Sequence, residues 1–337
     1  MSPRGVLPPN AREALSLDRR LVARFRADLA RLIDDGRNSV LVAVSGGADS
    51  VALLLLAHAV LGKRCHAATV DHGLRPASGS EAAMVAQLCA ARGIDHAILV
   101  GNLPERAGKT ANLSARARLL RYRLLQHHAA AVGATWIATG HHGDDQLETL
   151  LMRLNRGAGL AGLAAIRRRS GRIIRPLLGW RRAELAGLVV GCGIEAVDDP
   201  SNVDDRYDRA RLRKLLAGID WLDVERIGVS VGALGDAEDA LAWATRQALA
   251  EHGVLGEGSA SIAAAGLPNE IVRRLVRACV EHVDSATEPT GSGLMRMVEA
   301  LRLGRRVTMG DVLAEPRGDG ADRMCWHFEH APPRRGR

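Results

Sequence analysis

A six-residue turn between two apolar runs constrains the fold more than any other stretch. Residues 40–44 are rich in Val and predict a strand, whereas residues 51–60 carry Ala and Leu and predict a helix. The turn between them reads Ser45-Gly46-Gly47-Ala48-Asp49-Ser50. Free N–H groups at the start of such a helix favour a bound anion, which the glycines allow to approach closely. Because Asp49 is an acid, its side chain is better suited to bind a metal ion or a ribose hydroxyl than the phosphate itself.

The pattern of strands and helices continues beyond this turn. Strands are expected near 65–70, 94–100 and 135–139, with helices over 78–92 and 112–132 between them. This alternation predicts an α/β fold with a doubly wound, mostly parallel sheet. A further short strand is expected at 172–178, and the chain from about 220 is expected to be mainly helical, closing with a helix-loop-strand piece over 290–330.

These patterns predict four parts of the chain. They are a flexible N-terminal extension (1–20), an α/β domain (21–218), a smaller and mainly helical C-terminal domain (219–330), and a basic tail (331–337).

Charge and cysteine content narrow the class of protein. The chain has 46 Lys and Arg residues against 38 Asp and Glu, a net charge of +8 that suits a nucleic-acid partner. A general compositional preference for Arg would look the same. The five cysteines are widely spaced without a C-x-x-C pair, which argues against a disulfide framework, zinc or an iron–sulfur cluster. We expect a cytoplasmic protein without membrane spans.

A second cluster of polar residues follows the strand at 135–139 and extends from Thr139 to Thr149. Asp145 and Glu148 are three residues apart and fall on one face of the expected helix, with Asp144 near its start. Such acids could bind Mg²⁺ or an ammonium group, although a capped helix start with solvated acids is an alternative. Both clusters end strands of one parallel sheet, so we expect a joint site at its carboxyl edge.

A glycine pattern at 157–162 matches G-x-G-x-x-G but follows a helix instead of a strand. It therefore does not indicate a dinucleotide site. We interpret it as a glycine-rich loop that, with Arg153 and Arg156, could lie close to a nucleic acid.

The order of motifs resembles the tRNA(Ile)-lysidine synthase family, within the N-type ATP pyrophosphatases that cleave ATP to AMP and pyrophosphate. The resemblance covers about 40–216. The matching stretches are Ser45–Ser50, Asp71–Arg75 with Glu81, Asn112 with Ala117–Tyr122, Thr139–Thr149 continuing through Arg156–Gly159 to Leu163, Ile174–Leu178, and Asp199–Asn202 with Arg209, Arg211 and Arg213.

The resemblance implies an enzyme with a two-step reaction. It also implies that 21–218 is the ATP-binding catalytic domain and 219–330 the C-terminal tRNA-recognition domain. ATP adenylates the wobble cytidine of tRNA(Ile) with a CAU anticodon, and free lysine then attacks C2 of that base, so that the tRNA is read as isoleucine instead of methionine. Residues Ser45 to Ser50, including Ala48, would bind ATP, and Asp49 would hold Mg²⁺. Asp49, Asp145 and Glu148 are the expected catalytic residues. Asp145 and Glu148 would bind the lysine amine, and one of them, or His141 or His142, must take its proton.

The expected partners are tRNA(Ile) and free lysine, and a homodimer is compatible with the sequence. The candidate tRNA contacts are Arg118, Arg121, Arg153, Arg156, Arg209, Arg211 and Arg213. The alternatives are a tRNA thiolase of the same ATP-using group, a small-molecule adenylating synthetase and a non-catalytic tRNA-binding protein.

Overall fold

The structure, a computed structural model, describes residues 17–34, 38–73, 78–101, 113–164, 166–197, 208–216, 218–219, 221–318 and 325–332. The chain divides into two compact units. The first contains residues 1–158 and 162–232, and the second contains residues 159–161 and 233–337. None of the described helices combines the length and apolarity needed to cross a membrane.

The first unit is built on a six-stranded sheet, and the predicted doubly wound, mostly parallel fold is confirmed. The strand order is β3-β2-β1-β4-β6-β5, with β5 antiparallel to β6 and the other pairs parallel. The strands are β1 (Val40–Ala43), β2 (Cys65–Asp71), β3 (Asp95–Val100), β4 (Trp136–Thr139), β5 (Arg169–Ser170) and β6 (Ile173–Ile174). The order reverses between β1 and β4, and ligands bind beside the strand ends at such a point.

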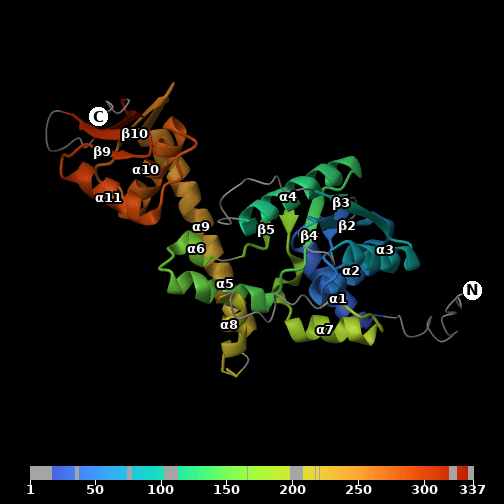
Figure 1. Cartoon of the computed structure of the whole chain (residues 1–337). Coiled ribbons are helices and arrows are strands. Elements are labelled where there is room, and N and C mark those ends of the chain that lie inside the picture. The colour runs from blue at the N-terminus through green and yellow to red at the C-terminus, as the bar shows by residue number, and fades with distance from the viewer. Residues whose placement is uncertain are drawn as a thin grey trace, which may run out of the picture. The chain divides into compact units, whose positions relative to one another are not determined.

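Helices cover both faces of this sheet (Figure 1). One face is covered by α1 (Arg19–Ala30), α2 (Ala48–Leu61), α3 (Ser78–Ala91) and α7 (Arg182–Gly191). The other face is covered by α4 (Leu113–Ala131), whose Leu125 and Ala129 pack against Leu41 and Ile137. The remaining helical segments of this part are η2 (Gly62–Arg64), α5 (Gly143–Asn155), α6 (Leu160–Leu163), η3 (Pro176–Gly179) and α8 (Asp208–Leu216).

Two expectations about local structure are wrong. The helix after the first turn begins at Ala48 instead of residue 51, so Asp49 and Ser50 belong to its first turn. The expected strand at 172–178 shrinks to β6, because Pro176 opens the 3₁₀ helix η3. Proline has no N–H for a strand ladder, but its fixed φ suits the first turn of a helix.

Trp180 links the sheet's helices to the candidate site. Its side chain is fully buried, its Nε1 donates to Asp28 Oδ2 on α1 at 2.9 Å, and the guanidinium of Arg24 lies 4.3 Å from its ring centroid. The carbonyl of Trp180 accepts a hydrogen bond from Gly143 N at 2.8 Å. This residue therefore fixes the start of α5 against α1.

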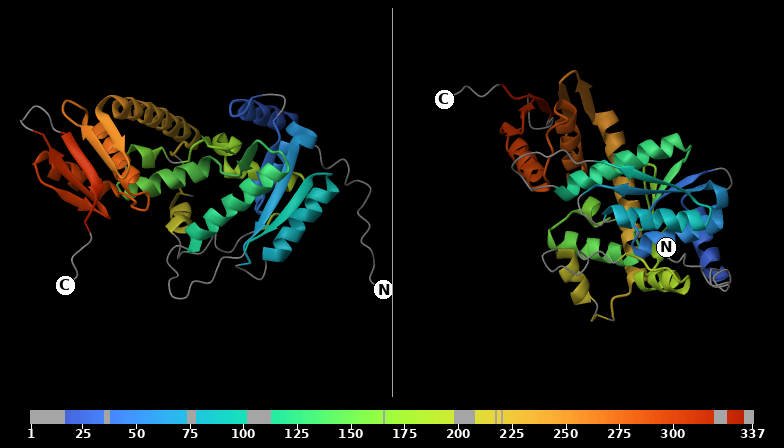
Figure 2. Two further views of the ribbon diagram at one scale, coloured as in Figure 1. Left: turned by 90° about the horizontal axis from the view of Figure 1, so that it is seen from above. Right: turned by 45° about the vertical axis from the view of Figure 1, so that its right-hand side comes forward.

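The second unit packs helices against one face of a five-stranded antiparallel sheet (Figure 2). Its order is β7-β8-β11-β10-β9. The elements are α9 (Val224–His252, beginning in the first unit), β7 (Gly253–Gly256), β8 (Ser259–Ala263), α10 (Asn269–Val283), α11 (Gly291–Arg302), β9 (Val307–Met309), β10 (Val312–Arg317) and β11 (Cys325–His330). The hairpin β7–β8 was not expected, because its Gly, Ser and Ala residues give a weak strand signal.

Replacing Trp180 by Phe should lower the free energy of unfolding of the first unit by about 1–3 kcal/mol, because the buried Asp28 carboxylate loses a donor. Trp326 is a matched control, since it is also fully buried but its Nε1 has no hydrogen-bond partner among the described residues. Trp326→Phe should therefore cost less. Urea unfolding followed separately for each unit would measure both, and equal losses would contradict the role of the Asp28 bond.

Candidate active site

The turn between β1 and α2 is shaped to receive an anion. Gly46 has φ +88°, which favours glycine, and the Oγ of Ser50 donates to the Gly47 carbonyl at 2.9 Å. The amide of Ser45 donates to the same Oγ at 3.1 Å. Helix α2 has no side-chain cap at Gly47, so the amides of Ala48 and Asp49 at its start can bind a ligand, whereas the Ser50 amide donates to the Gly47 carbonyl at 3.0 Å.

The end of β4 packs directly on this turn. A Cβ added at Gly140 would lie 3.1 Å from the backbone C and O of Asp49 and from the N of Ser50. Strands β1 and β4 are parallel neighbours, with Ala43 opposite Thr139, so both turns leave the sheet at the same edge. The expectation that the two polar clusters meet there is confirmed.

His142 joins the two clusters through three carboxylates. Its ring is almost fully buried, with Nε2 at 3.4 Å from Asp49 Oδ2 and at 3.6 Å from Asp145 Oδ2. Its Nδ1 lies 3.6 Å from Asp144 Oδ2. Asp145 Oδ2 also accepts from the backbone N of His142 at 3.2 Å, which fixes the start of α5.

This environment makes His142 a cation. Burial alone would lower the pKa of His142, but hydrogen bonds to Asp144 and Asp49 and the charge of Asp145 raise it to about 10. Although burial opposes it, His142 and the bonds from Arg182 N and Arg181 hold the pKa of Asp144 well below its usual range. A protonated ring donates from both nitrogens, so the 3.4 Å approach of the Asp145 amide to Nδ1 is a contact and not a hydrogen bond.

His141, the next residue back, has the opposite character. Burial lowers the pKa of His141 to about 4; Asp145 opposes the shift, and Arg175 and Arg118 add to it. Its Nδ1 lies 2.9 Å from Thr139 Oγ1. Between the two histidines, only His141 is neutral near pH 7 and can accept a proton.

Glu148 already has cationic partners. The carboxylate is 2% exposed, and Arg213 on α8 donates to both of its oxygens, at 2.7 Å and 3.0 Å. Arg209 approaches Oε2 at 3.2 Å. This double pairing fastens α8 to α5 and raises the pKa of Arg213.

A cavity of about 250 Å³ lies beside this ion pair. Asp144, Glu148 and three arginines line it together with an apolar wall. The full lining is Asp144, Leu147, Glu148, Arg181, Arg182, Arg213, Leu216, Ile219, Leu222 and Val224. It can take a short aliphatic chain with charged ends.

Each of the other arginines expected to contact tRNA has a partner within the chain. Arg118 lies over the Tyr122 ring, and Arg121 lies 3.5 Å from His72 Nε2. Arg156 and Arg211 both pair with Asp208, whereas Arg153 donates to the Gly162 carbonyl. Their contribution to an RNA surface stays a prediction.

Asp49 retains one oxygen that could hold a metal ion. Its Oδ1 is buried without a hydrogen-bond partner in the described part of the chain, while Oδ2 faces His142. No group of three or more His, Cys, Asp or Glu side chains suited to a metal occurs among the described residues. One free carboxylate oxygen fits Mg²⁺, which keeps several waters and takes further ligands from substrate phosphates.

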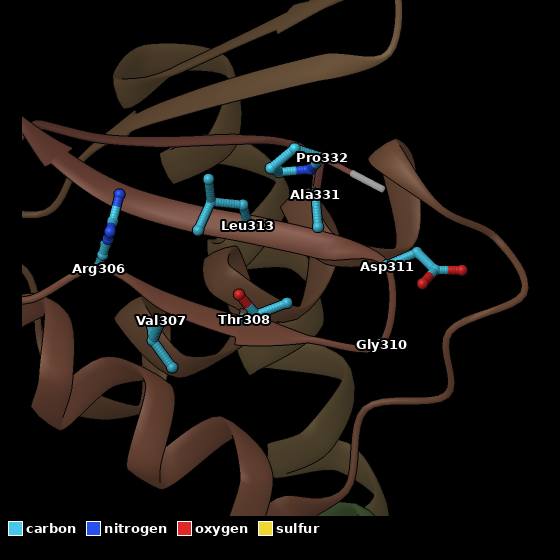
Figure 3. A pocket seen from close by; sticks show the side chains of 8 residues that line it. All are labelled: Arg306, Val307, Thr308, Gly310, Asp311, Leu313, Ala331 and Pro332. Atoms are coloured by element: carbon cyan, nitrogen blue, oxygen red, sulfur yellow. The ribbon is translucent and has the colours of Figure 1, made fainter. Parts of the chain in front are cut away.

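The second unit has a larger cavity, of about 520 Å³, on its sheet (Figure 3). Its lining mixes apolar residues with Arg306, Thr308 and Asp311. Arg306 and Asp311 stand at opposite ends of it, so the charged groups of the lining do not converge on one point (Figure 3). We therefore place the chemistry in the first unit.

Sequence reasoning missed the central role of His142 and the pairing of Glu148. The first had a local signal, because His142 lies within one helical turn of Asp144 and Asp145. The second had none, because Arg213 lies 65 residues from Glu148.

Comparison with known proteins gives consistent results. A PP-loop domain family matches residues 20–218. The tRNA(Ile)-lysidine synthase of Novosphingobium aromaticivorans is 44% identical over 320 residues, covering 93% of this chain and 94% of the relative. The tRNA(Ile)-lysidine synthase of Zymomonas mobilis is 40% identical over 303 residues, covering 87% of this chain and 89% of the relative. The U34-tRNA thiolase NcsA from Methanococcus maripaludis, with its 4Fe–4S cluster, has a TM-score of 0.54 over 64% of this chain and 78% of its own; at 18% identity it shows the fold alone.

Gly140→Ala should weaken ATP binding roughly 10- to 100-fold, because the new methyl group displaces the first turn of α2. Gly187→Ala is the matched control, since nothing lies within 4 Å of a Cβ at that position of α7. It should leave binding unchanged and stabilise the fold by about 0.5–1 kcal/mol. Calorimetric titration with ATP measures both, and unimpaired binding by Gly140→Ala would show that the close contact is unimportant.

His142 should stabilise the fold most at low pH. Its folded pKa of about 10 exceeds the ordinary 6.5, so its contribution is complete below pH 6.5 and is lost as pH rises through 10. The stability difference between the wild type and His142→Asn, from urea unfolding in metal-free buffer, should shrink over that range. His96, whose pKa burial lowers, is a control that should lose its contribution towards acid instead. Titration of the His142 ring near 6.5 by NMR would contradict the charge cluster.

Proposed function

The chain belongs to the tRNA(Ile)-lysidine synthase family of PP-loop enzymes, and we propose that it forms lysidine by adenylating the wobble cytidine and then ligating lysine to it. It is an ATP-dependent ligase that acts on tRNA(Ile). The observation that carries the two-step proposal is the junction at His142, where the anion-binding turn meets the acidic start of α5.

In the first step, we propose that the turn from Ser45 to Ser50 holds the pyrophosphate end of ATP. The cytidine O2 attacks the α-phosphate, and pyrophosphate leaves. Open amides at the start of α2 stabilise the charge that develops on the leaving group. His142 holds Asp49 through Oδ2, which leaves Oδ1 without a hydrogen-bond partner among the described residues. When Mg²⁺ is bound there, it neutralises phosphate charge.

In the second step, the amine of lysine attacks C2 of the adenylated base and AMP leaves. We propose that the cavity beside Glu148 holds this lysine, with its methylenes against Leu147 and Leu222 and its ammonium towards Glu148. The ammonium then competes with Arg213 for the same carboxylate. Asp145 is the second proposed lysine ligand, and its carboxylate accepts a hydrogen bond from the backbone N of His142.

The amine must lose a proton before it attacks. His142 is already protonated, so it cannot serve. We propose His141, whose neutral ring lies in the same turn. Its lowered pKa makes it a weak base in the free enzyme, and phosphate charge nearby would strengthen it.

The remaining proposals concern the partners. We propose that the tRNA carries a CAU anticodon and that Arg118, Arg121, Arg153, Arg156, Arg209, Arg211 and Arg213 supply phosphate contacts. We propose that the protein is located in the cytoplasm, because the free cysteines of the chain and its tRNA substrate both suit that compartment. A homodimer stays a prediction. The relatives do not favour a thiolase, a small-molecule synthetase or a non-catalytic binder.

The test is incorporation of labelled lysine into RNA. Protein, ATP, Mg²⁺ and a tRNA(Ile) transcript with CAU should give labelled RNA, because only that tRNA presents the correct base and body. The methionine tRNA, which shares the anticodon, should stay unlabelled. RNA-stimulated AMP formation without labelled RNA would point to another nucleophile. If neither AMP nor labelled RNA is formed, the result would contradict the proposal.

Two variants separate the steps. Asp49→Ala should abolish pyrophosphate release, because the variant lacks the carboxylate that is proposed to hold Mg²⁺ beside the nucleotide. Glu148→Gln should retain pyrophosphate release but need more lysine for half-maximal labelling. An unchanged lysine requirement would remove Glu148 from the lysine site.

A further inference from the structure

The five tryptophan side chains of the protein lie in very different environments. Trp180 and Trp326 are fully buried, and Trp136 lies beneath the guanidinium of Arg169, whose carbon is 4.3 Å from its ring centroid. Trp221 is 79% exposed and Trp243 is 59% exposed. Aromatic residues make up 3% of the sequence, so an indole left in water needs an explanation.

Trp221 lies in a segment that borders the catalytic cavity. Ile219 and Leu222 line that cavity together with Glu148 and Arg213. Val224, at the start of α9, reaches the place where a Cβ on Gly143 would lie, at 2.8 Å. Residues 219 and 221–224 therefore lie along the start of α5. Since Leu222 faces the cavity and Trp221 stays exposed, the indole stands at the outer rim of the site.

The surroundings of Trp221 suit a polyanion. Helix α8, which ends five residues before it, carries Arg209, Arg211, Arg213 and Lys214 against a single acid of its own, Asp208, although Arg209 and Arg213 also pair with Glu148 on α5. Of the acids that follow, Asp223 pairs with Arg226 and accepts from the amide of Glu225. A flat aromatic face beside a basic helix is the arrangement used by proteins that bind unpaired nucleotides.

We infer that Trp221 stacks against an unpaired base of the anticodon loop, next to the cytidine that meets the lysine held in the cavity beside Glu148. This inference rests on the proposed function, because it takes tRNA as the substrate. The target base must leave its stack to reach the site, and the base that remains loses a stacking neighbour. The indole replaces that neighbour and holds the loop open at the rim.

The experiment compares four variants in binding an RNA hairpin that copies the anticodon arm of tRNA(Ile). Trp221→Ala should weaken binding roughly 5- to 100-fold, the usual effect of losing one stacked base. Trp221→Phe should keep most of the affinity, whereas Trp221→Leu should behave like Ala, because it has apolar area but no π face. Trp243→Ala is the exposed-tryptophan control and should bind like the wild type.

The loss should be the same at low and high salt, because stacking releases no counterions. KM for ATP and for lysine in the full reaction should stay unchanged in Trp221→Ala, while KM for tRNA rises. Three results would each overturn the inference. They are wild-type RNA affinity in Trp221→Ala, equal RNA affinity of Trp221→Leu and Trp221→Phe, and a similar loss of RNA affinity in Trp243→Ala. A change of oligomeric state on ultracentrifugation without a change in RNA affinity would overturn it as well. If the wild type binds the hairpin but incorporates no lysine, the proposed reaction fails while the stacking result stands.

Discussion

The site depends on one buried imidazolium surrounded by three carboxylates. His142 sits where the order of the parallel strands reverses, and it joins Asp49 from the β1–α2 turn to Asp144 and Asp145 at the start of α5. Without this cation, three negative charges would meet within a few ångströms in a poorly hydrated place. The cation therefore makes it possible for the acids of two strand ends to lie close together.

The backbone around His142 is held by contacts that reach through the core. Gly140 lets β4 touch the first turn of α2, and the Gly143 amide binds the Trp180 carbonyl. Trp180 in turn is anchored by Asp28 on α1. The position of the catalytic edge is thus set by packing on the far side of α5, so substitutions distant from any ligand can still alter the chemistry.

The sequence predicted the parts of this site whose signals are local. The strand-turn-helix pattern around Ser45–Ser50 lies within the single stretch 40–60, and the helical spacing of Asp145 and Glu148 lies within one turn. What could not be predicted depends on partners distant in the chain. Glu148 meets Arg213 across 65 residues, and Trp180 meets Asp28 across 152. The prediction of a strand at 172–178 was wrong because its apolar residues are buried in a different conformation. Leu177 and Leu178 are buried in a 3₁₀ helix that begins at Pro176, and burial alone does not distinguish this helix from a strand.

Charge balance links the proposed nucleotide and amine sites. The carboxylates of Asp49, Asp144, Asp145 and Glu148 face an equal number of cations, namely His142, Arg181, Arg209 and Arg213. These ion pairs cancel one another's charge, so they add no net attraction for a triphosphate. The Oδ1 of Asp49, which has no partner among the described residues, suits a cation that arrives with the nucleotide. An ammonium that replaced Arg213 at Glu148 would preserve the balance. It would also free a guanidinium at the surface where the RNA backbone is expected, so filling the amine site would strengthen the grip on the tRNA.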